Sequence, residues 1–142
     1  MNIFCTGNKE KKDFFECVKK LKNITSQFDH RLYLDNKLID GEELVDFDNI
    51  ILSSLNDTKK SYDLVISIGG DGALLHTIRL MNKKQIPVLG IHIGNLGFLN
   101  QINNIEMSQS LSELFSMKEI SYQKFNLIEA NVISNTDSIL LL

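Results

Sequence analysis

Residues 62–72 read YDLVISIGGDG, a near-continuous apolar run that ends in three glycines and one aspartate. An apolar run of this kind, rich in β-branched residues, is typical of a strand buried on both faces of a parallel sheet. The stretch from Gly72 to Asn82 has the spacing of an amphipathic helix, with His76 and Arg79 on its outer face. Its apolar side chains are expected to pack on the sheet: Leu74, Leu75, Ile78 and Met81. The sequence therefore predicts a strand, a glycine turn and a crossover helix.

The turn Gly69-Gly70-Asp71-Gly72 has the composition of a ligand-binding loop. Glycine has no side chain and adopts left-handed torsions, so the backbone can approach a phosphate or a nucleotide closely. The free N–H groups and the dipole of a helix N-terminus favour an anion at the same place. A carboxylate at Asp71 is unexpected there, which suggests that it has a chemical role. The alternative is that Asp-Gly is a common turn and that Asp71 only caps the helix.

A second glycine-rich segment, GIHIGNLGFL at residues 90–99, follows another apolar run from Pro87 to Ile91. Two strand-to-glycine junctions at this spacing fit one βαβ unit. Both loops then open at the carboxyl edge of the sheet, where ligands of open α/β sheets bind. We expect the two loops to face one pocket. Loops on opposite edges, or an Asp71 carboxyl turned inward and locked by main-chain amides, would contradict this interpretation.

Together the two segments resemble the NAD kinase family. That family has a GGDG turn followed by Thr or Ser, and one helix later a Gly-x-Asn/His-x-Gly-x-Leu-Gly-Phe segment; this chain has GGDGALLHTIR and GIHIGNLGFL. The GGDG turn alone also occurs in diacylglycerol and sphingosine kinases and in phosphofructokinases, whereas the second segment is more specific. The resemblance is strong from Tyr62 to Leu99 and looser elsewhere. Ala73 replaces the hydroxyl residue, which is expected to cost nucleotide affinity about 1 kcal/mol.

The resemblance implies transfer of the ATP γ-phosphoryl group to the 2′-hydroxyl of the adenosine ribose of NAD, which gives NADP. Asp71 would be the catalytic residue that orients the hydroxyl and accepts its proton late, because a helix N-terminus keeps a carboxylate ionised. The implied nucleotide-binding residues are Gly69, Gly70, Asp71, Gly72, Leu75, His76 and Phe98. Mg²⁺ or another divalent cation would accompany the donor, which is ATP or polyphosphate. Full-length relatives are homo-oligomers, so a dimer or tetramer is implied.

Several residues near the two loops have a second interpretation. Phe98 is expected to stack on adenine, with a core position as the alternative. His76 is expected near a phosphate, with a plain surface position as the alternative. His92 is expected to hydrogen-bond the backbone and shape the loop rather than bind a metal, and His30 to be an exposed loop residue. The loop glycines are assigned to special backbone torsions: Gly69, Gly70, Gly72, Gly94 and Gly97.

The remaining chain completes an α/β fold with a doubly wound, mostly parallel sheet of the NAD kinase and diacylglycerol kinase kind. Residues 1–103 are assigned to this nucleotide-binding domain, and residues 104–142 to the start of a β-rich second domain. The other predicted elements are a strand at 2–5, a helix at 9–23 with Phe14, Val18 and Leu21 as its apolar stripe, a strand at 31–34, a helical turn or two within 44–55, a linker at 100–104, a short helix with Met107, Leu111 and Leu114 in register, and strands at 125–133 and 138–142.

Composition limits the function further. The chain is 43% hydrophobic and 23% charged, which is ordinary for a globular protein. A net charge of −3 argues against nucleic acid or an anionic membrane as partner. No signal peptide or membrane-spanning run is found, so a cytoplasmic location is expected. Cys5 and Cys17 are expected to be small buried hydrophobes rather than a disulfide or a zinc site.

Two alternatives to a NAD kinase stay open. The first is a lipid kinase domain that uses the same turn, against which the second segment argues. The second is a non-catalytic dinucleotide-binding module, which no sequence feature decides. The chain ends in the apolar run Ile139 to Leu142, and the Asn-Glu or Asn-Asp pair of the family's second domain is not found in it. We therefore expect a fragment with little or no kinase activity alone.

Overall fold

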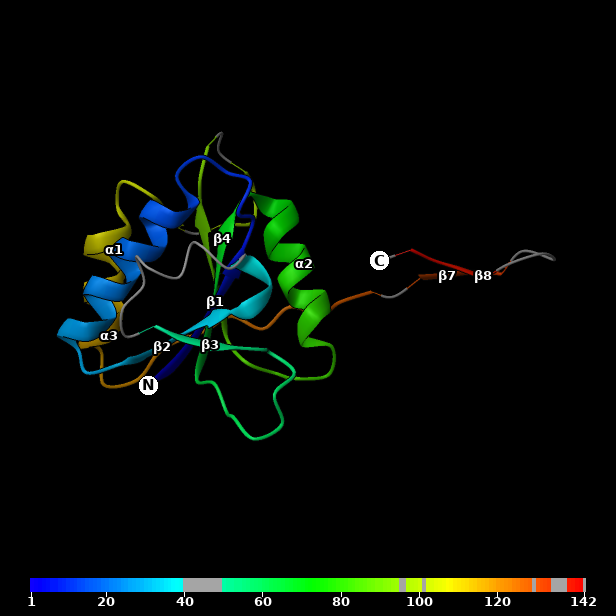
Figure 1. The fold of residues 1–142 in the computed structure, drawn as a ribbon. Helices are drawn as coiled ribbons and strands as arrows, with labels where there is room; N and C mark the ends of the chain where they lie inside the picture. Colours follow the sequence, from blue (N-terminus) through cyan, green and yellow to red (C-terminus); the bar gives the residue numbers. More distant parts are fainter. Residues whose placement is uncertain (40–49, 95–96, 101, 129, 134–137, 142) are drawn as a thin grey trace.

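The computed structural model describes residues 1–39, 50–94, 97–100, 102–128, 130–133 and 138–141. Its centre is a six-stranded sheet with the strand order β3-β2-β1-β4-β5-β6 and only parallel neighbours (Figure 1). The strands are β1 (Asn2–Gly7), β2 (Arg31–Asp35), β3 (Ile51–Ser53), β4 (Leu64–Gly69), β5 (Val88–His92) and β6 (Ile102–Asn103). The predicted open parallel α/β sheet is confirmed.

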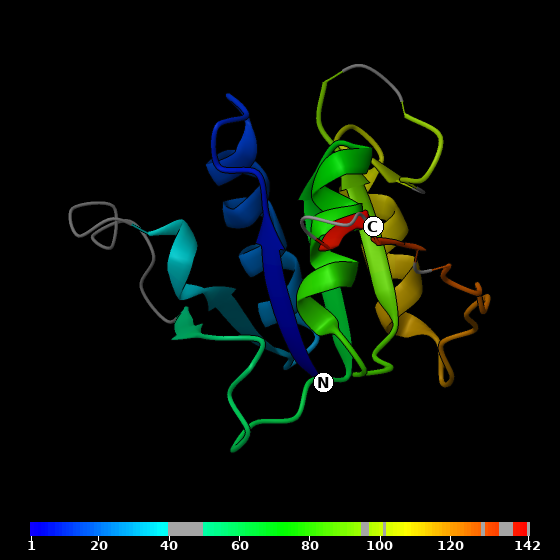
Figure 2. The ribbon, with the colours of Figure 1, turned by 90° about the vertical axis from the view of Figure 1, so that its right-hand side faces the viewer.

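Helices cover both faces of this sheet. The helices are α1 (Phe14–Gln27), α2 (Asp71–Met81) and α3 (Met107–Ser116), and a 3-10 turn, η1, spans Asn36–Leu38. Helices α1 and α3 lie side by side on one face and α2 lies on the other (Figures 1 and 2). Strand residues alternate between the two layers: Ile66 and Ile68 of β4 pack in the larger apolar cluster with α1 and α3, and Val65 packs with Met81 of α2.

The strand order creates a switch point between β1 and β4. The chain runs from β1 outward through β2 to β3, and then returns to the other side of β1 to form β4 and β5. Helices that follow β1 and β4 therefore lie on opposite faces, which leaves a crevice at the carboxyl ends of these two strands. Gly7 pairs with Ile68, and the Asn8 N–H donates to the Ile68 carbonyl at 2.9 Å, so the two strands end together.

Two predicted elements and the packing of one side chain need correction. Helix α1 begins at Phe14 rather than near residue 9, because Asn8 starts a turn in which its side chain accepts the Glu10 N–H and its carbonyl accepts the Lys11 N–H. Part of the helical prediction for 44–55 lies outside the described residues, but Ile51–Ser53 is strand β3. Leu75 does not pack on the sheet, since its side chain is 42% exposed. The α1 stripe of Phe14, Val18 and Leu21 is buried as predicted.

The predicted linker at 100–104 is also wrong. Ile102–Asn103 forms β6, which pairs with β5 at the edge of the sheet. Helix α3 follows at once, and its Met107, Leu111 and Phe115 belong to the same apolar cluster as α1. The packed α/β layers thus continue past residue 103 into α3, whereas the predicted domain boundary at 104 stays a prediction.

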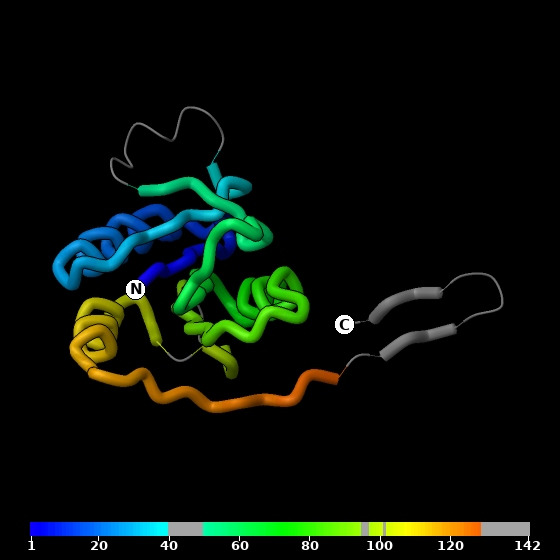
Figure 3. Tube along the Cα trace, turned by 90° about the horizontal axis from the view of Figure 1, so that it is seen from below, coloured from blue at the N-terminus to red at the C-terminus, as the bar shows by residue number. Residues whose placement is uncertain are grey.

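The C-terminal part has less regular structure. Residues 117–128 form an extended trace without helix or strand that runs along the outside of the layers (Figure 3). Strands β7 (Ala130–Ile133) and β8 (Ser138–Leu141) lie within the two predicted strand ranges, although the first of them starts later than residue 125. The two strands pair antiparallel, and residues 134–137 between them lie outside the described residues. In the part of the chain that the structure describes, no helix is long and apolar enough to cross a membrane.

His30 is not the exposed loop residue that the sequence predicts. Its ring packs edge-on against Phe115 of α3, with ring centroids 4.9 Å apart, and lies 6.1 Å from Phe28. Its Nδ1 atom is 3.3 Å from the amino-terminal nitrogen of Met1. Burial and that positive charge lower the pKa of His30. Cys5 and Cys17 are buried and free, as expected for small hydrophobes.

Candidate functional site

The two glycine segments meet at one edge of the sheet, as predicted. Gly69 at the end of β4 pairs with His92 at the end of β5, and the Ile93 N–H donates to the Gly69 carbonyl at 3.1 Å. Gly69 has φ +152°, and a Cβ atom placed there would lie 2.7 Å from the Cβ of Ala73. Both the torsion and the contact require glycine at this corner. The requirement that both loops share an edge is met.

Asp71 connects the two segments. It is the first residue of α2, and Gly70 is the N-cap, so Asp71 is not the cap and the capping alternative is wrong. The Phe98 N–H donates to Oδ2 of Asp71 at 2.8 Å, and the Leu99 N–H donates to Oδ1 at 3.1 Å. The side-chain amide of Asn100 also donates to Oδ1, at 3.2 Å. The Asp71 carboxylate of the first segment therefore holds the second segment through three hydrogen bonds. We call this set of hydrogen bonds the Asp71 clasp.

This clasp sets the charge of the carboxyl group. The N–H groups of Phe98 and Leu99 stabilise the ionised form and lower the pKa of Asp71, while partial desolvation opposes them. The lowered pKa agrees with the predicted ionised state, and the hydrogen bond from Phe98 is its largest cause beside the expected effect of the helix N-terminus. The carboxyl group is only half-buried, so it is not turned inward. It is nevertheless held by two main-chain amides, so one of the two features that together would contradict the interpretation is present and the other is not.

The glycines of the two segments differ in whether, and why, the structure requires a glycine. The torsion prediction is confirmed for Gly69 and Gly94, whereas Gly70, Gly72 and Gly97 have no positive φ. Gly97 is needed for space, since a Cβ atom there would lie 2.3 Å from Oδ1 of Asp71. A Cβ atom at Gly70 or Gly72 would meet no protein atom within 4 Å. The bare backbone at these two positions faces open space into which a ligand could enter.

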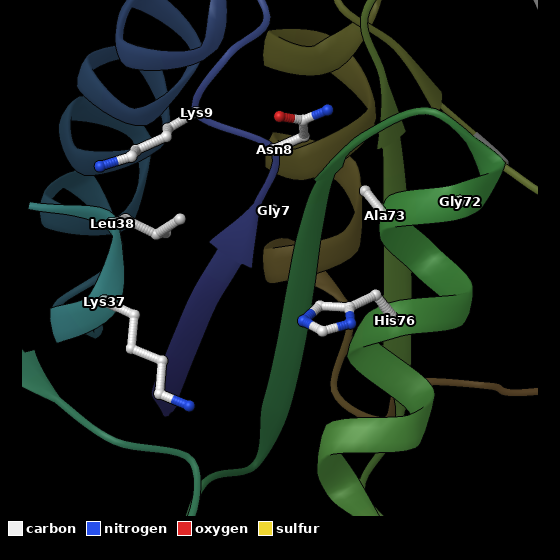
Figure 4. Close-up of a pocket in the computed structure, with 8 residues that line it drawn as sticks. All are labelled: Gly7, Asn8, Lys9, Lys37, Leu38, Gly72, Ala73 and His76. Atoms are coloured by element: carbon white, nitrogen blue, oxygen red, sulfur yellow. The ribbon is translucent and has the colours of Figure 1, made fainter.

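A pocket of about 330 Å³ lies at the crevice between β1 and β4 (Figure 4). Residues from three places line it: Gly7, Asn8 and Lys9 after β1, Lys37 and Leu38 in η1, and Gly72, Ala73 and His76 in α2. Figure 4 shows the His76 ring extending from α2 toward the side formed by η1. Ala73 leaves this wall without the hydroxyl group that the family resemblance leads one to expect. The pocket thus combines a helix N-terminus with lysine side chains, which is a favourable setting for an anion.

Only part of the predicted site lines this pocket. Gly72 and His76 do, and His76 is exposed on α2. Leu75 is exposed on α2 but does not line the pocket, and neither does Asp71, whose carboxylate bonds the second segment. Phe98 is fully exposed, so the core alternative for it is wrong. The structure brings Asp71 and Phe98 together through the backbone and leaves the Phe98 ring in solvent.

Sequence reasoning missed the β1 side of the site. Asn8, Lys9 and Lys37 line the pocket although none was a candidate. The turn Thr6-Gly7-Asn8 after the first strand was the available signal, because the loop after the central strand flanks the switch point of an open sheet. Asn100 was missed because it was assigned to a linker.

His92 differs from its predicted role. It is the last residue of β5 and is 5% exposed, and neither ring nitrogen has a hydrogen-bond partner among the described residues. It does not shape the loop by bonding the backbone, although its proximity helps to lower the pKa of Asp71. Within the described ranges, no group of three His, Cys, Asp or Glu side chains is placed to hold a metal ion.

Comparison with known proteins shows which family has this fold and the two glycine segments. The family model "ATP-NAD kinase N-terminal domain" matches residues 7–120. NAD kinase of Hahella chejuensis is 32% identical over 138 residues, which is 97% of this chain and 45% of that protein. NAD kinase of Pseudomonas putida is 42% identical over 77 residues, which is 54% of this chain and 26% of that protein.

The fold has a solved counterpart in yeast NADH kinase complexed with NADH. The TM-score is 0.68 at 23% identity, over 82% of this chain and 36% of that one. The chain spans less than half the length of these relatives. Because the family model covers most of the chain and both glycine segments, the chain belongs to the NAD kinase family and corresponds to its N-terminal domain.

Proposed function

We propose that this chain supplies the catalytic carboxylate and part of the nucleotide site of an enzyme that phosphorylates the 2′-hydroxyl of the adenosine ribose of NAD. One observation carries the proposal: the two glycine segments meet at one sheet edge, and Asp71 bridges them. Membership of the NAD kinase family supports the same reaction. The second glycine segment and this membership do not favour a lipid kinase.

In this mechanism Asp71 orients the substrate hydroxyl. As the hydroxyl oxygen forms its bond to the γ-phosphorus, the bond from that phosphorus to the bridging oxygen breaks and the hydroxyl proton passes to the carboxylate. The lowered pKa of Asp71 makes it a weak base. Phosphoryl transfer passes through a loose transition state in most analyses, so a weak, well-placed base that accepts the proton late is sufficient.

The pocket beside α2 is the proposed place for the phosphates of the donor, ATP or polyphosphate. Asn8, Lys37 and His76 offer donors and positive charge on its wall. A divalent cation, preferably Mg²⁺, would neutralise phosphate charge there. Magnesium is commonly held by substrate phosphates, water and one or two carboxylates, which fits a chain that offers no described carboxylate cluster.

The adenosine part of NAD has two exposed apolar neighbours. Phe98 offers a free ring on which a base can stack, and Leu75 offers apolar surface one turn into α2. Neither needs to leave a core to make such contacts. Gly70 and Gly72 present the bare backbone between these side chains and the pocket.

The test compares two carboxylates that both accept a main-chain N–H. We suggest a chimera in which this chain replaces the matched N-terminal part of the Hahella chejuensis enzyme. Asp71→Asn is expected to lower NADP formation from NAD and Mg-ATP by about a hundredfold or more, with NAD binding largely kept. Asp63→Asn is the matched control, because Asp63 accepts the Asn2 N–H at 2.7 Å at the opposite end of the strands.

Near-normal turnover of Asp71→Asn would refute the catalytic role and favour the non-catalytic binding module, in which the Asp71 clasp is structural only. The 142-residue chain alone is expected to show little or no NADP formation, since it spans less than half of its relatives. Assembly into a dimer or tetramer and a cytoplasmic location are part of the same proposal. Sedimentation of the chimera tests the first point, and fractionation of the cells that produce this chain tests the second.

A further inference from the structure

The two oxygens of the Asp71 carboxylate are not equivalent. A carboxylate has about four acceptor positions, two on each oxygen. Oδ1 receives the Leu99 N–H at 3.1 Å and the Asn100 side-chain amide at 3.2 Å, whereas Oδ2 receives the Phe98 N–H at 2.8 Å. The three hydrogen bonds thus place two donors on Oδ1 and one on Oδ2, and the main-chain N–H of Asn100 also stabilises the ionised carboxylate. Among these three hydrogen bonds, a hydroxyl group that approaches Asp71 meets fewer competing donors at Oδ2 than at Oδ1.

The Asn100 side chain occupies space that is free only because residue 90 is glycine. A Cβ atom on Gly90 of β5 would lie 2.2 Å from Oδ1 of Asn100 and 3.3 Å from its Cα. The Asn100 side chain thus fills the space left by the glycine and reaches Asp71 across the end of the sheet. The orientation of its amide follows from Asp71, because the reverse orientation would set an amide oxygen against a carboxylate oxygen. Its own Oδ1 is buried and has no partner among the described residues.

We propose that Asn100 is a positioning residue, which occupies Oδ1 of Asp71 so that Oδ2 receives the proton of the substrate hydroxyl. This inference rests on the proposed catalytic role of Asp71. The main-chain donors Phe98 and Leu99 cannot be varied by side-chain exchange. Among these three hydrogen bonds, Asn100 alone donates from a side chain, so it is the donor that a substitution can remove from Oδ1. It acts through Asp71 and does not touch the substrate.

The first test uses the 142-residue chain and needs no activity. The carboxyl carbon of Asp71 is titrated by ¹³C NMR in the unaltered chain and in Asn100→Ala. Loss of one donor to the ionised form is expected to move the titration of Asp71 to higher pH. Asn103→Ala is the matched control, because the Asn103 side chain accepts the Glu106 N–H at 2.8 Å rather than donating to Asp71. An unmoved titration in Asn100→Ala would overturn the inference.

The second test uses the active chimera. Asn100→Ala is expected to lower kcat about fivefold to tenfold, with KM for NAD little changed, and to move the acid limb of the pH–rate profile upward. Gly90→Ala, which displaces the Asn100 side chain, is expected to shift the profile in the same direction. In the double variant the clash with the amide is removed and only the 3.3 Å approach to the Cα of residue 100 remains, so folding stability is expected to recover in part toward the Asn100→Ala value while the altered profile remains.

These outcomes separate the inference from the proposed function. Full turnover in Asp71→Asn would refute the catalytic role of Asp71, whatever effect the Asn100→Ala substitution has on the NMR titration. A second outcome would refute the role of Asn100 alone. In that outcome Asp71→Asn loses turnover, but Asn100→Ala has an unchanged kcat, pH–rate profile and NMR titration.

Discussion

Nothing in the described part of the fold requires glycine at position 72, which agrees with its proposed place in the nucleotide site. It lies in the first turn of α2, where alanine is the better helix former. Its torsions do not need glycine, and a methyl group would meet no protein atom. Gly97 is the opposite case, since the space beside it is filled by the Asp71 carboxylate. The fold explains Gly97, whereas Gly72 is explained by what the proposed nucleotide needs.

Replacing these two glycines by alanine should therefore have opposite effects. Gly72→Ala is expected to keep or raise the free energy of unfolding, by about 0.5 kcal/mol, and to weaken nucleotide binding about tenfold. Gly97→Ala is expected to destabilise the chain, because the new methyl group collides with Oδ1 of Asp71. Urea unfolding and calorimetric titration with NAD and Mg-ATP measure both quantities. Unchanged nucleotide affinity in Gly72→Ala would contradict the site.

The strands and helices differ in how far their own residues determine them. Strand β4 is buried along its whole length and α2 is strongly periodic, so both were predictable. Strands β3 and β6 have only three and two residues at the sheet edges, and pairing with β2 and β5 defines them. The start of α1 depends on side-chain hydrogen bonds of Asn8, which compete with helix formation.

The same distinction applies to the site. The common edge of the two loops followed from parallel topology, and the glycine turn marked Asp71. The hydrogen bonds from Phe98, Leu99 and Asn100 depend on the path of the second loop back over α2, which no local pattern encodes. The pocket residues in η1 depend on strand order, because β2 brings Lys37 beside α2 only when it pairs with β1.

The junction of α1, β2 and α3 is predicted to be sensitive to pH through His30. Its folded pKa lies below the value of about 6.5 in an unfolded chain, so the folded state binds the proton less well. This contribution to stability is present above that value and is lost as the pH falls through the folded pKa. The unfolding temperature should therefore fall between about pH 7 and pH 5 more steeply than in His30→Gln.

Ser108→Ala provides the control for this experiment, because Ser108 is exposed on α3 and carries no titratable group, so its replacement should leave the slope of unfolding temperature against pH unchanged. Thermal unfolding followed by circular dichroism gives both slopes. Equal slopes for the unaltered chain and His30→Gln would show that the ring between Phe28 and Phe115 does not titrate with folding.

Across the described residues, exposed apolar side chains are most numerous in one segment, 117–128. After α3 the chain carries an apolar strip, whose side chains are each more than half exposed: Met117, Tyr122, Phe125, Leu127 and Ile128. Single exposed apolar residues are ordinary, but a run of them is a site of association in solution. The ordered layers end at α3, so this strip does not contribute to their core.

We expect the purified 142-residue chain to bind a hydrophobic dye and to self-associate at high concentration through the apolar strip. Replacing Phe125 and Ile128 by serine should reduce both effects without lowering the unfolding temperature. Ile51→Ser is the control, because Ile51 is a partly exposed apolar residue on β3, far from the strip in sequence. Dye fluorescence and sedimentation measure the change, and no reduction in the double variant would contradict this assignment.

The most direct test of the site is a crystal structure of the active chimera with NAD and an unreactive donor analogue. We predict the 2′-hydroxyl of the adenosine ribose within about 2.6–3.2 Å of Oδ2 of Asp71, with the donor phosphates in the pocket between β1 and α2. A ribose bound away from the two glycine corners, with Asp71 contacting only Phe98, Leu99 and Asn100, would contradict it.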